Sequence, residues 1–208
     1  MSGTLPTSPS FSSVVIKSNN PNIVTMSTSG RRQVKTQQTQ FWSFTGKFPP
    51  LTRSQWGPIA AFVVKQRGSY ESFTMILPEY STTYGALTTE PVTIVNTETI
   101  GATAIELTSG SLTMPGALKA GDFIKFAGVG SPPVGGHNKV YMVVDDVDFS
   151  GGTATMNIEP GLVNGVATTM ILDYKDVEFT VFLPNDVQEF NTGLAGMSTY
   201  ELDLREAL

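Results

Sequence analysis

Catalysis by a histidine-activated nucleophile would have to use His137, because the chain has only one histidine and no cysteine. Such catalysis needs a nucleophile and a base that are oriented toward each other. No nucleophile-elbow motif accompanies His137, which follows a glycine-rich turn. We therefore expect His137 to be an ordinary loop residue, and we do not expect an enzyme.

A second candidate for chemistry is the pattern D-V-D-F-S-G at 146–151. It places Asp146, Asp148 and Ser150 at the first, third and fifth positions of a calcium-binding loop, with glycine at the sixth. The twelfth position is Asn157 instead of the usual glutamate, and no helix is predicted on either side. A β-hairpin turn explains the pattern equally well, so a weak calcium site and a turn both remain open.

Two further groups of residues could act on sugars. Glu71, Glu79 and Glu90 could supply an acid and a base for glycoside hydrolysis, but scattered carboxylates are usually solvated surface. Aromatic side chains between positions 41 and 56 could form a platform on which a sugar stacks. Their setting on a predicted strand and helix favours a hydrophobic core, because buried aromatics supply much of a core's apolar area. These aromatic residues are Phe41, Trp42, Phe44, Phe48 and Trp56.

Three cations, Arg31, Arg32 and Lys35, follow the turn signal Ser29-Gly30. A run of cations usually lies on a solvent-exposed face. The stretch around it has few apolar residues that could fix it to a core, so we expect it to be flexible in a single chain. We expect the three cations to pair with acidic groups of a neighbouring subunit, which makes them the predicted subunit interface.

The composition favours association over nucleic-acid binding. Charged residues make up only 15% of the 208 residues, so the surface is weakly protected against contact with neighbours. The formal net charge is −5, whereas nucleic-acid-binding modules normally carry a basic footprint. The N-terminal residues lack the features of a signal peptide, and no apolar run approaches the roughly 20 residues that span a bilayer. We expect a soluble chain without a cofactor or a membrane partner.

One long helix is predicted at about 52–67. Thr52 can act as its N-cap, with Gln55 completing a capping box. The predicted helix has one buried face, because the i, i+3, i+4, i+7 spacing places on it Trp56, Ile59, Ala60 and Val63. Pro58 should kink this helix or delay its start.

The other segments read as strands and turns, and the composition changes twice along the chain. From about residue 85 to 172 the sequence is rich in Thr, Val and Gly, with short apolar runs at the spacing of a small barrel or sandwich. After that segment, aromatic residues are again frequent, as they are in the first part of the chain. We therefore predict an outer β-domain made of 1–84 and 173–208, with 85–172 inserted into it.

Five stretches of the chain, taken together, carry a family resemblance. They lie at 30–68, 118–128, 137–147, 153–162 and 177–208, and they include GRRQVKTQQTQFWSFTGKFPPLTRSQWGPIAAFVVKQRG and VEFTVFLPNDVQEFNTGLAGMSTYELDLREAL. In this order, and over most of the chain, they resemble the distal tail or minor tail proteins at the tail tip of long-tailed bacteriophages. The segment 129–136, VGSPPVGG, departs from the family as a local loop extension.

The resemblance implies a mainly β fold of the tail-tube type, a split β-barrel or sandwich with one helix packed on it. Such proteins form a ring, commonly a hexamer, that joins the tail tube protein to the hub and fibre proteins. DNA passes through the central channel without specific binding, so Arg31, Arg32 and Lys35 are expected to point away from it. The chain would then be a virion protein, assembled in the host cytoplasm. The alternative is a carbohydrate-binding module for host recognition, carried by 85–172.

Overall fold

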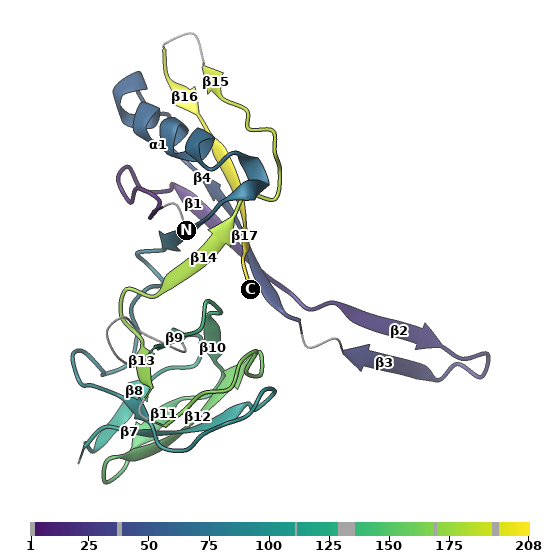
Figure 1. The fold of residues 1–208 in the computed structure, drawn as a ribbon, viewed down its shortest axis with the longest axis vertical. Coiled ribbons are helices and arrows are strands. Elements are labelled where there is room, and N and C mark those ends of the chain that lie inside the picture. Colours follow the sequence, from purple (N-terminus) through teal and green to yellow (C-terminus); the bar gives the residue numbers. More distant parts are fainter. Residues whose placement is uncertain (1–2, 37–38, 111, 129–135, 169, 193–195) are drawn as a thin grey trace. The chain divides into compact units, whose positions relative to one another are not determined.

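The chain is mainly β, with one α-helix and a closed barrel among the described residues, which confirms the predicted fold class. It divides into two compact units, unit 1 (residues 1–75 and 180–208) and unit 2 (residues 76–179). The segment predicted as an insert, 85–172, lies within unit 2. The structure, a computed structural model, describes residues 3–36, 39–110, 112–128, 136–168, 170–192 and 196–208 (Figure 1). Of the predicted loop extension at 129–136, residues 129–135 lie outside the described residues.

Unit 1 is built on a five-stranded sheet in which the last strand of the chain is central. The strand order is β1-β4-β17-β14-β5. These strands are β1 (Ser13–Asn19), β4 (Phe41–Lys47), β17 (Glu201–Glu206), β14 (Glu178–Phe182) and β5 (Ser72–Ile76). The pairing of β17 with β4 confirms that the C-terminal segment joins strands of the N-terminal segment in one sheet.

Alternating side chains decide which face of this sheet is buried. In β17, Leu202 and Leu204 are buried, whereas Glu201 and Asp203 are exposed. Leu204 lies opposite the buried Phe44 of β4. A slip of one residue would move every leucine to the solvent face, so the hydrophobic core fixes this register.

Helix α1 (Arg53–Lys65) begins where its capping residues predict. Thr52 is the N-cap, and its backbone N–H donates a hydrogen bond to Oε1 of Gln55 (3.1 Å). Pro58 lies inside the helix, but the helix starts at its predicted position and not after the proline. The missing N–H of Pro58 therefore does not prevent helix formation, because packing of the apolar face outweighs one lost hydrogen bond.

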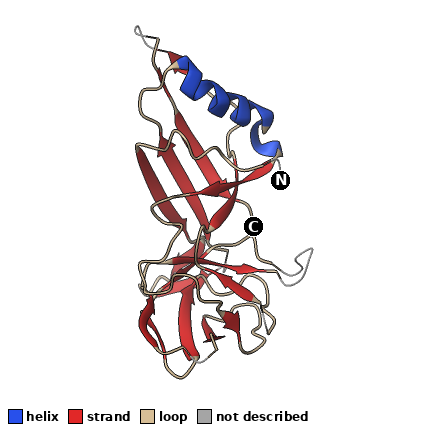
Figure 2. Ribbon diagram, turned by 90° about the vertical axis from the view of Figure 1, so that its left-hand side faces the viewer, coloured by secondary structure: helices blue, strands red, loops and turns tan. Residues whose placement is uncertain are grey.

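The apolar face of α1 packs on the sheet of unit 1 (Figure 2). Ile59, Ala60 and Val63 are buried, as their spacing predicts. The ring of Phe62 meets Phe73 of β5 edge to face, with 5.2 Å between centroids. One helix thus covers the buried face of the sheet, which has no second α-helix among the described residues.

The N-terminal arm covers one edge of this sheet. The N–H of Leu5 donates to the carbonyl of Thr74 in β5 (2.8 Å), and the N–H of Thr74 donates to the carbonyl of Gly3 (3.0 Å). Leu5 itself is buried. The arm therefore pairs with a strand edge that would otherwise be free to associate.

Unit 2 contains a closed barrel of six strands in the order β10-β12-β7-β6-β13-β9. A separate two-stranded ladder joins β8 (Met114–Leu118) to β11 (Val147–Phe149). The barrel encloses a core that includes Ile105, Phe126 and Met156, all fully buried. The barrel strands are β6 (Thr93–Ile94), β7 (Ala104–Thr108), β9 (Phe123–Ala127), β10 (Tyr141–Val143), β12 (Thr153–Glu159) and β13 (Ile171–Asp173).

Short elements complete unit 1. A 3₁₀ turn, η1 (Gly68–Tyr70), follows the helix, and β15 (Asn191–Thr192) pairs with β16 (Ser198–Thr199). Two further strands, β2 (Asn22–Met26) and β3 (Arg32–Thr36), pair with each other.

We expect Gly85→Ala to destabilise unit 2 by about 1–3 kcal/mol, the usual cost of overpacking a closely packed site. A Cβ at Gly85 would lie 2.0 Å from the carbonyl oxygen of Ala117, and backbone cannot move aside as a flexible side chain can. The matched control is Gly57→Ala in α1, where a Cβ meets nothing within 4 Å apart from its chain neighbours and the backbone of the helix. Alanine favours a helix by up to about 1 kcal/mol, but a Cβ directly before Pro58 disfavours the helical conformation, so the stability of unit 1 should change by less than about 1 kcal/mol.

The two units can be followed separately in this experiment. Both tryptophans, Trp42 and Trp56, belong to unit 1, so tryptophan fluorescence during urea unfolding reports on unit 1 alone. Far-UV circular dichroism reports on both units. An unchanged dichroism midpoint for Gly85→Ala would contradict the close approach at this position.

Candidate interaction surface

The β2–β3 hairpin continues the ladder formed by β1 and β4 (Figure 1). At its turn, the N–H of Ser27 donates to the carbonyl of Arg31 and the N–H of Gly30 donates to the carbonyl of Ser27, both at 2.9 Å. Gly30 has φ +77°, a left-handed conformation that favours glycine. The sequence predicted the turn at Ser29-Gly30, but it did not predict the strand Arg32–Thr36.

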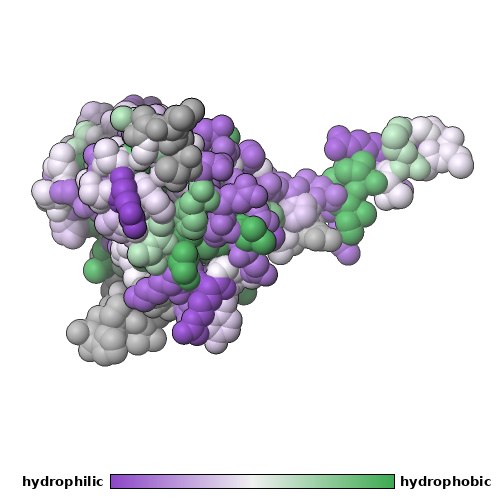
Figure 3. All heavy atoms as spheres, turned by 90° about the horizontal axis from the view of Figure 1, so that it is seen from above, coloured by the Kyte–Doolittle hydropathy of each residue, from purple (hydrophilic) through white to green (hydrophobic). Residues whose placement is uncertain are grey.

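This hairpin is exposed along its whole described length. Every residue from Pro21 to Lys35 is exposed, and four of them are large apolar side chains. In Figure 3 the hairpin, on the right, shows apolar atoms in green beside hydrophilic atoms in purple. The exposed fractions are 51% for Ile23, 50% for Val24, 71% for Met26 and 50% for Val34. Exposed apolar side chains gathered on one element mark interaction sites.

The three predicted interface cations all belong to this hairpin. Arg31 closes the turn, Arg32 lies opposite Met26, and Lys35 lies opposite Ile23. All three side chains are exposed, and none of them forms an ion pair with another described residue. Since successive residues of a strand point to opposite faces, Arg32 and Lys35 lie on opposite faces of the hairpin.

The acidic residues of the calcium pattern are each bonded within unit 2. Oδ2 of Asp146 pairs with Nζ of Lys119 at 2.6 Å, which lowers the pKa of the carboxyl and raises the pKa of the amine. Oδ1 of Asp148 accepts the N–H of Gly116 (2.5 Å). Ser150 lies in an isolated bridge with Thr153. Among the described residues, no group of three His, Asp or Glu side chains could hold a metal ion.

His137 lies outside the strands, as expected, but it is buried, with 2% of its surface exposed. Its Nδ1 lies 2.9 Å from the hydroxyl of Tyr141, and its Nε2 lies 3.3 Å from the carbonyl of Gly165. Burial lowers the pKa of the ring. The histidine is therefore part of the barrel core, and sequence spacing gave no signal of its partners.

The aromatic residues considered as a sugar platform belong mainly to the core of unit 1. Trp42, Phe44 and Phe48 are each at most 5% exposed. The two others are half-buried and have partners. The guanidinium of Arg205 lies 3.8 Å from the ring centroid of Phe41, and Trp56 stacks on Phe190 at 5.6 Å.

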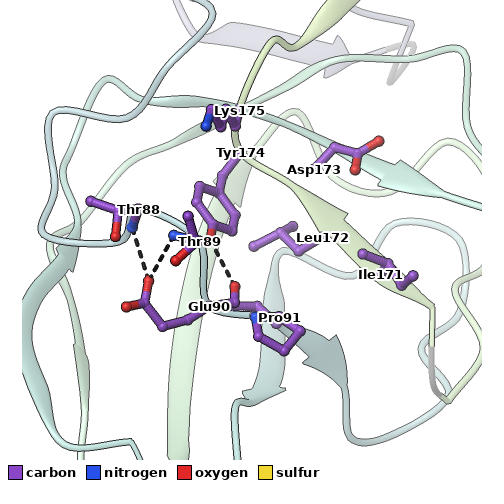
Figure 4. Close-up of a pocket in the computed structure, with 10 residues that line it drawn as sticks. Thr88, Thr89, Glu90, Pro91, Ile171, Leu172, Asp173, Tyr174 and Lys175 are labelled. Atoms are coloured by element: carbon purple, nitrogen blue, oxygen red, sulfur yellow. Dashed lines mark hydrogen bonds between the residues drawn. The ribbon is translucent and has the colours of Figure 1, made fainter.

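A pocket of about 280 Å³ in unit 2 lies between the segment 88–92 and β13 with its following residues (Figure 4). The carboxylate of Glu90 accepts the N–H groups of Thr88 and Thr89, which lowers its pKa. The hydroxyl of Tyr174 donates to the carbonyl of Glu90 (2.7 Å), and this ring is only 7% exposed. The pocket therefore presents no open aromatic face on which a sugar ring could stack.

No helix among the described residues is both long and apolar enough to cross a membrane. No model of a known protein family matches this chain, and no curated protein matches it significantly.

Proposed function

We propose that this chain is a structural subunit of the tail tip of a long-tailed bacteriophage, and that it assembles with copies of itself into a ring of six. The family follows from the sequence resemblance. The structural observation that supports assembly is the exposed β2–β3 hairpin, with its four large apolar side chains and three cations. A two-stranded hairpin without a core is marginally stable in water, so a partner surface would stabilise it.

In this function the chain acts by binding and not by catalysis. The ring joins the tail tube protein to the hub and fibre proteins, and DNA passes through its channel. A channel wall should not neutralise phosphates, because released counterions would make the wall hold the genome. The net charge of −5 has the sign that suits such a wall.

Assembly can be tested with the purified full chain. We expect sedimentation velocity to show larger species as the concentration rises, and negative-stain electron microscopy to show closed rings. The test variant replaces residues 20–40 by Asn-Gly. Because Asn19 and Phe41 face each other in the β1–β4 ladder, a two-residue turn can join them directly.

This hairpin-free variant should remain folded and should not form rings. Its fold should survive because residues 21–35 are all exposed and the one described buried side chain that is removed, Gln40, donates only to the hydroxyl of Ser18 (3.0 Å). An unchanged tryptophan emission spectrum would show that unit 1 is still folded. If the wild type stays monomeric at every concentration, the proposal that this chain is a ring subunit is wrong. Rings of normal stability from the variant would show that assembly uses another surface.

A further inference from the structure

The sequence contains a single Asn-Gly pair, Asn164-Gly165, in a loop of unit 2. Both residues are exposed. Among the described residues, neither the side-chain amide of Asn164 nor the backbone N–H of Gly165 has a hydrogen-bond partner. Two neighbouring groups that can react with each other are therefore both free and both in contact with water.

Backbone hydrogen bonds hold the two ends of this loop. The N–H of Leu162 donates to the carbonyl of Ala102 (2.9 Å), and Val166 exchanges two hydrogen bonds of 3.0 Å with Glu98. Between these ends, residues 163–165 form no backbone–backbone hydrogen bond with any described residue. The tip of the loop can therefore change its backbone angles without breaking a ladder, as loops of low local stability do.

The tip is attached instead to two buried side chains of the barrel. The N–H of Val163 donates to the hydroxyl of Tyr141 (3.2 Å), and the carbonyl of Gly165 lies 3.3 Å from Nε2 of His137. His137 and Tyr141 are at most 2% exposed, so they depend on these loop atoms for their hydrogen bonds. Asn164 thus lies between two residues that satisfy buried polar groups.

We propose that Asn164 is a site of spontaneous deamidation, with water as the only co-reactant. The backbone nitrogen of Gly165 attacks Cγ of Asn164, and a new C–N bond closes a five-membered imide. The C–N bond of the side chain breaks, and its nitrogen leaves as ammonia with the proton of the attacking nitrogen. Water then opens the imide at either carbonyl, which gives aspartate or isoaspartate. Glycine favours the closure, because no Cβ stands beside the attacking nitrogen.

The two products should affect unit 2 differently. Aspartate keeps the backbone and changes only an exposed amide into a carboxylate. Isoaspartate adds one carbon to the main chain between Val163 and Gly165. Because both ends of the loop are held, the added carbon displaces at least one of the contacts to Tyr141 and His137. A buried group that loses its partner destabilises the fold, so isoaspartate is the damaging product.

Incubation of the full wild-type chain at pH 8 tests the site, beside a reference sample unfolded in guanidinium chloride. The incubation lasts until the unfolded reference has lost the amide of Asn164. Peptide mapping by mass spectrometry should then show that Asn164 has lost its amide in the folded chain too, and electron-transfer fragmentation should identify isoaspartate. Asn96 is also exposed in unit 2 and is the internal control. It should keep its amide, because it donates to Glu106 and precedes Thr97, whose side chain hinders closure.

Three outcomes would contradict this site. If the folded chain keeps the amide of Asn164, or loses that of Asn96 first, Asn164 is not the site. If aspartate forms without isoaspartate, the imide step is wrong. None of these outcomes depends on whether the chain assembles, so this inference and the proposed function can fail separately.

Two variants of Asn164 test the effect on unit 2, followed by far-UV circular dichroism. Asn164→Gln keeps an amide but cannot close a five-membered ring, so its thermal midpoint should not change during the incubation. Freshly purified Asn164→Asp should unfold with the wild type. The isoaspartate fraction of the incubated wild type should unfold at a midpoint lower by about 4 °C or more. Isoaspartate that leaves the midpoint of unit 2 unchanged would show that the loop is not coupled to His137 and Tyr141.

Discussion

Removal of residues 198–208 will unfold unit 1 and leave unit 2 folded. The deletion takes away β17, the central strand between β4 and β14, so the sheet would be cut in two. It also removes Leu202 and Leu204 from the core and the carboxylate of Glu206, which accepts the backbone N–H of Trp42 (3.0 Å). Each fully buried leucine contributes about 1.5–3 kcal/mol, and a domain has about 5–15 kcal/mol in all.

The tryptophans make this expectation measurable. Trp42 is buried and Trp56 stacks on Phe190, so the emission of both should shift to the red on truncation. Unit 2 should still show a cooperative thermal transition by far-UV circular dichroism. A truncated chain with native tryptophan emission would contradict the central position of β17.

A milder pair of substitutions serves as the control for the truncation. Leu204→Ala should cost about 2–5 kcal/mol, as large-to-small changes in a core do. Asp203→Ala, on the next residue, removes an exposed side chain whose Oδ1 accepts the hydroxyl of Thr45 (2.8 Å), and it should cost about 1 kcal/mol or less. If both variants lost a similar free energy of unfolding, the leucine face of β17 would not be the face that stabilises unit 1.

The sequence could predict elements whose side chains alternate or repeat with a helical period. β17 alternates Leu202 and Leu204 with charged residues, and α1 repeats Ile59, Ala60 and Val63 on one face. Both patterns exist because one side of the element is buried, and burial is what sequence periodicity records.

Elements whose side chains do not alternate in this way left no such signal. β3 reads R-Q-V-K-T and is exposed from Arg32 to Lys35, so no apolar alternation marks it as a strand. β8 contains Pro115 and Gly116, two residue types that argue against a strand, and it pairs with β11 across an irregular register. In both cases the strand forms because a specific partner strand lies beside it.

The candidate interaction surface was only partly predictable, because the sequence shows local clusters but not the partners of a side chain. The cluster of Arg31, Arg32 and Lys35 is visible in the sequence, but the separation of Arg32 from Lys35 onto two faces follows only from the hairpin register. The calcium pattern is local, yet its carboxylates are bonded to Lys119 and to the N–H of Gly116, which are distant in the chain. Spacing along a chain cannot supply partners of this kind.

A buried polar cluster surrounds His137 in unit 2. Its Nε2 faces only the carbonyl of Gly165, so Nε2 carries the proton and donates. Nδ1 then accepts from the hydroxyl of Tyr141, and the same hydroxyl accepts the N–H of Val163 (3.2 Å). Every polar atom of the cluster is satisfied while the imidazole is neutral.

Tyr141→Phe should therefore destabilise unit 2 by about 1–3 kcal/mol for each group that it leaves unpaired. The unpaired groups would be Nδ1 of His137 and the N–H of Val163. The shape of the ring is kept, so lost packing is not a competing explanation. The loss should appear in the circular dichroism transition and not in tryptophan fluorescence, because both tryptophans belong to unit 1.

The same cluster makes the stability of unit 2 depend on pH. Burial lowers the pKa of His137 in the folded state, whereas an unfolded histidine has a pKa of about 6.5. The unfolded chain therefore binds more protons between these two values, and stability is lost as the pH falls below about 6.5, by at most about 1.4 kcal/mol per pH unit. Above this pH the contribution is complete.

Urea unfolding at pH 7 and at pH 5 separates this effect from the hydrogen-bond loss. The wild type and Tyr141→Phe both keep His137, so both should lose stability in unit 2 between the two conditions. His137→Gln cannot titrate in this range, and its lower stability should change less between pH 7 and pH 5. Unit 1 contains no histidine, so its tryptophan transition provides an internal control in the same samples. A wild-type unit 2 that is as stable at pH 5 as at pH 7 would show that the imidazole can be protonated in place, with the hydroxyl of Tyr141 turned to accept its proton.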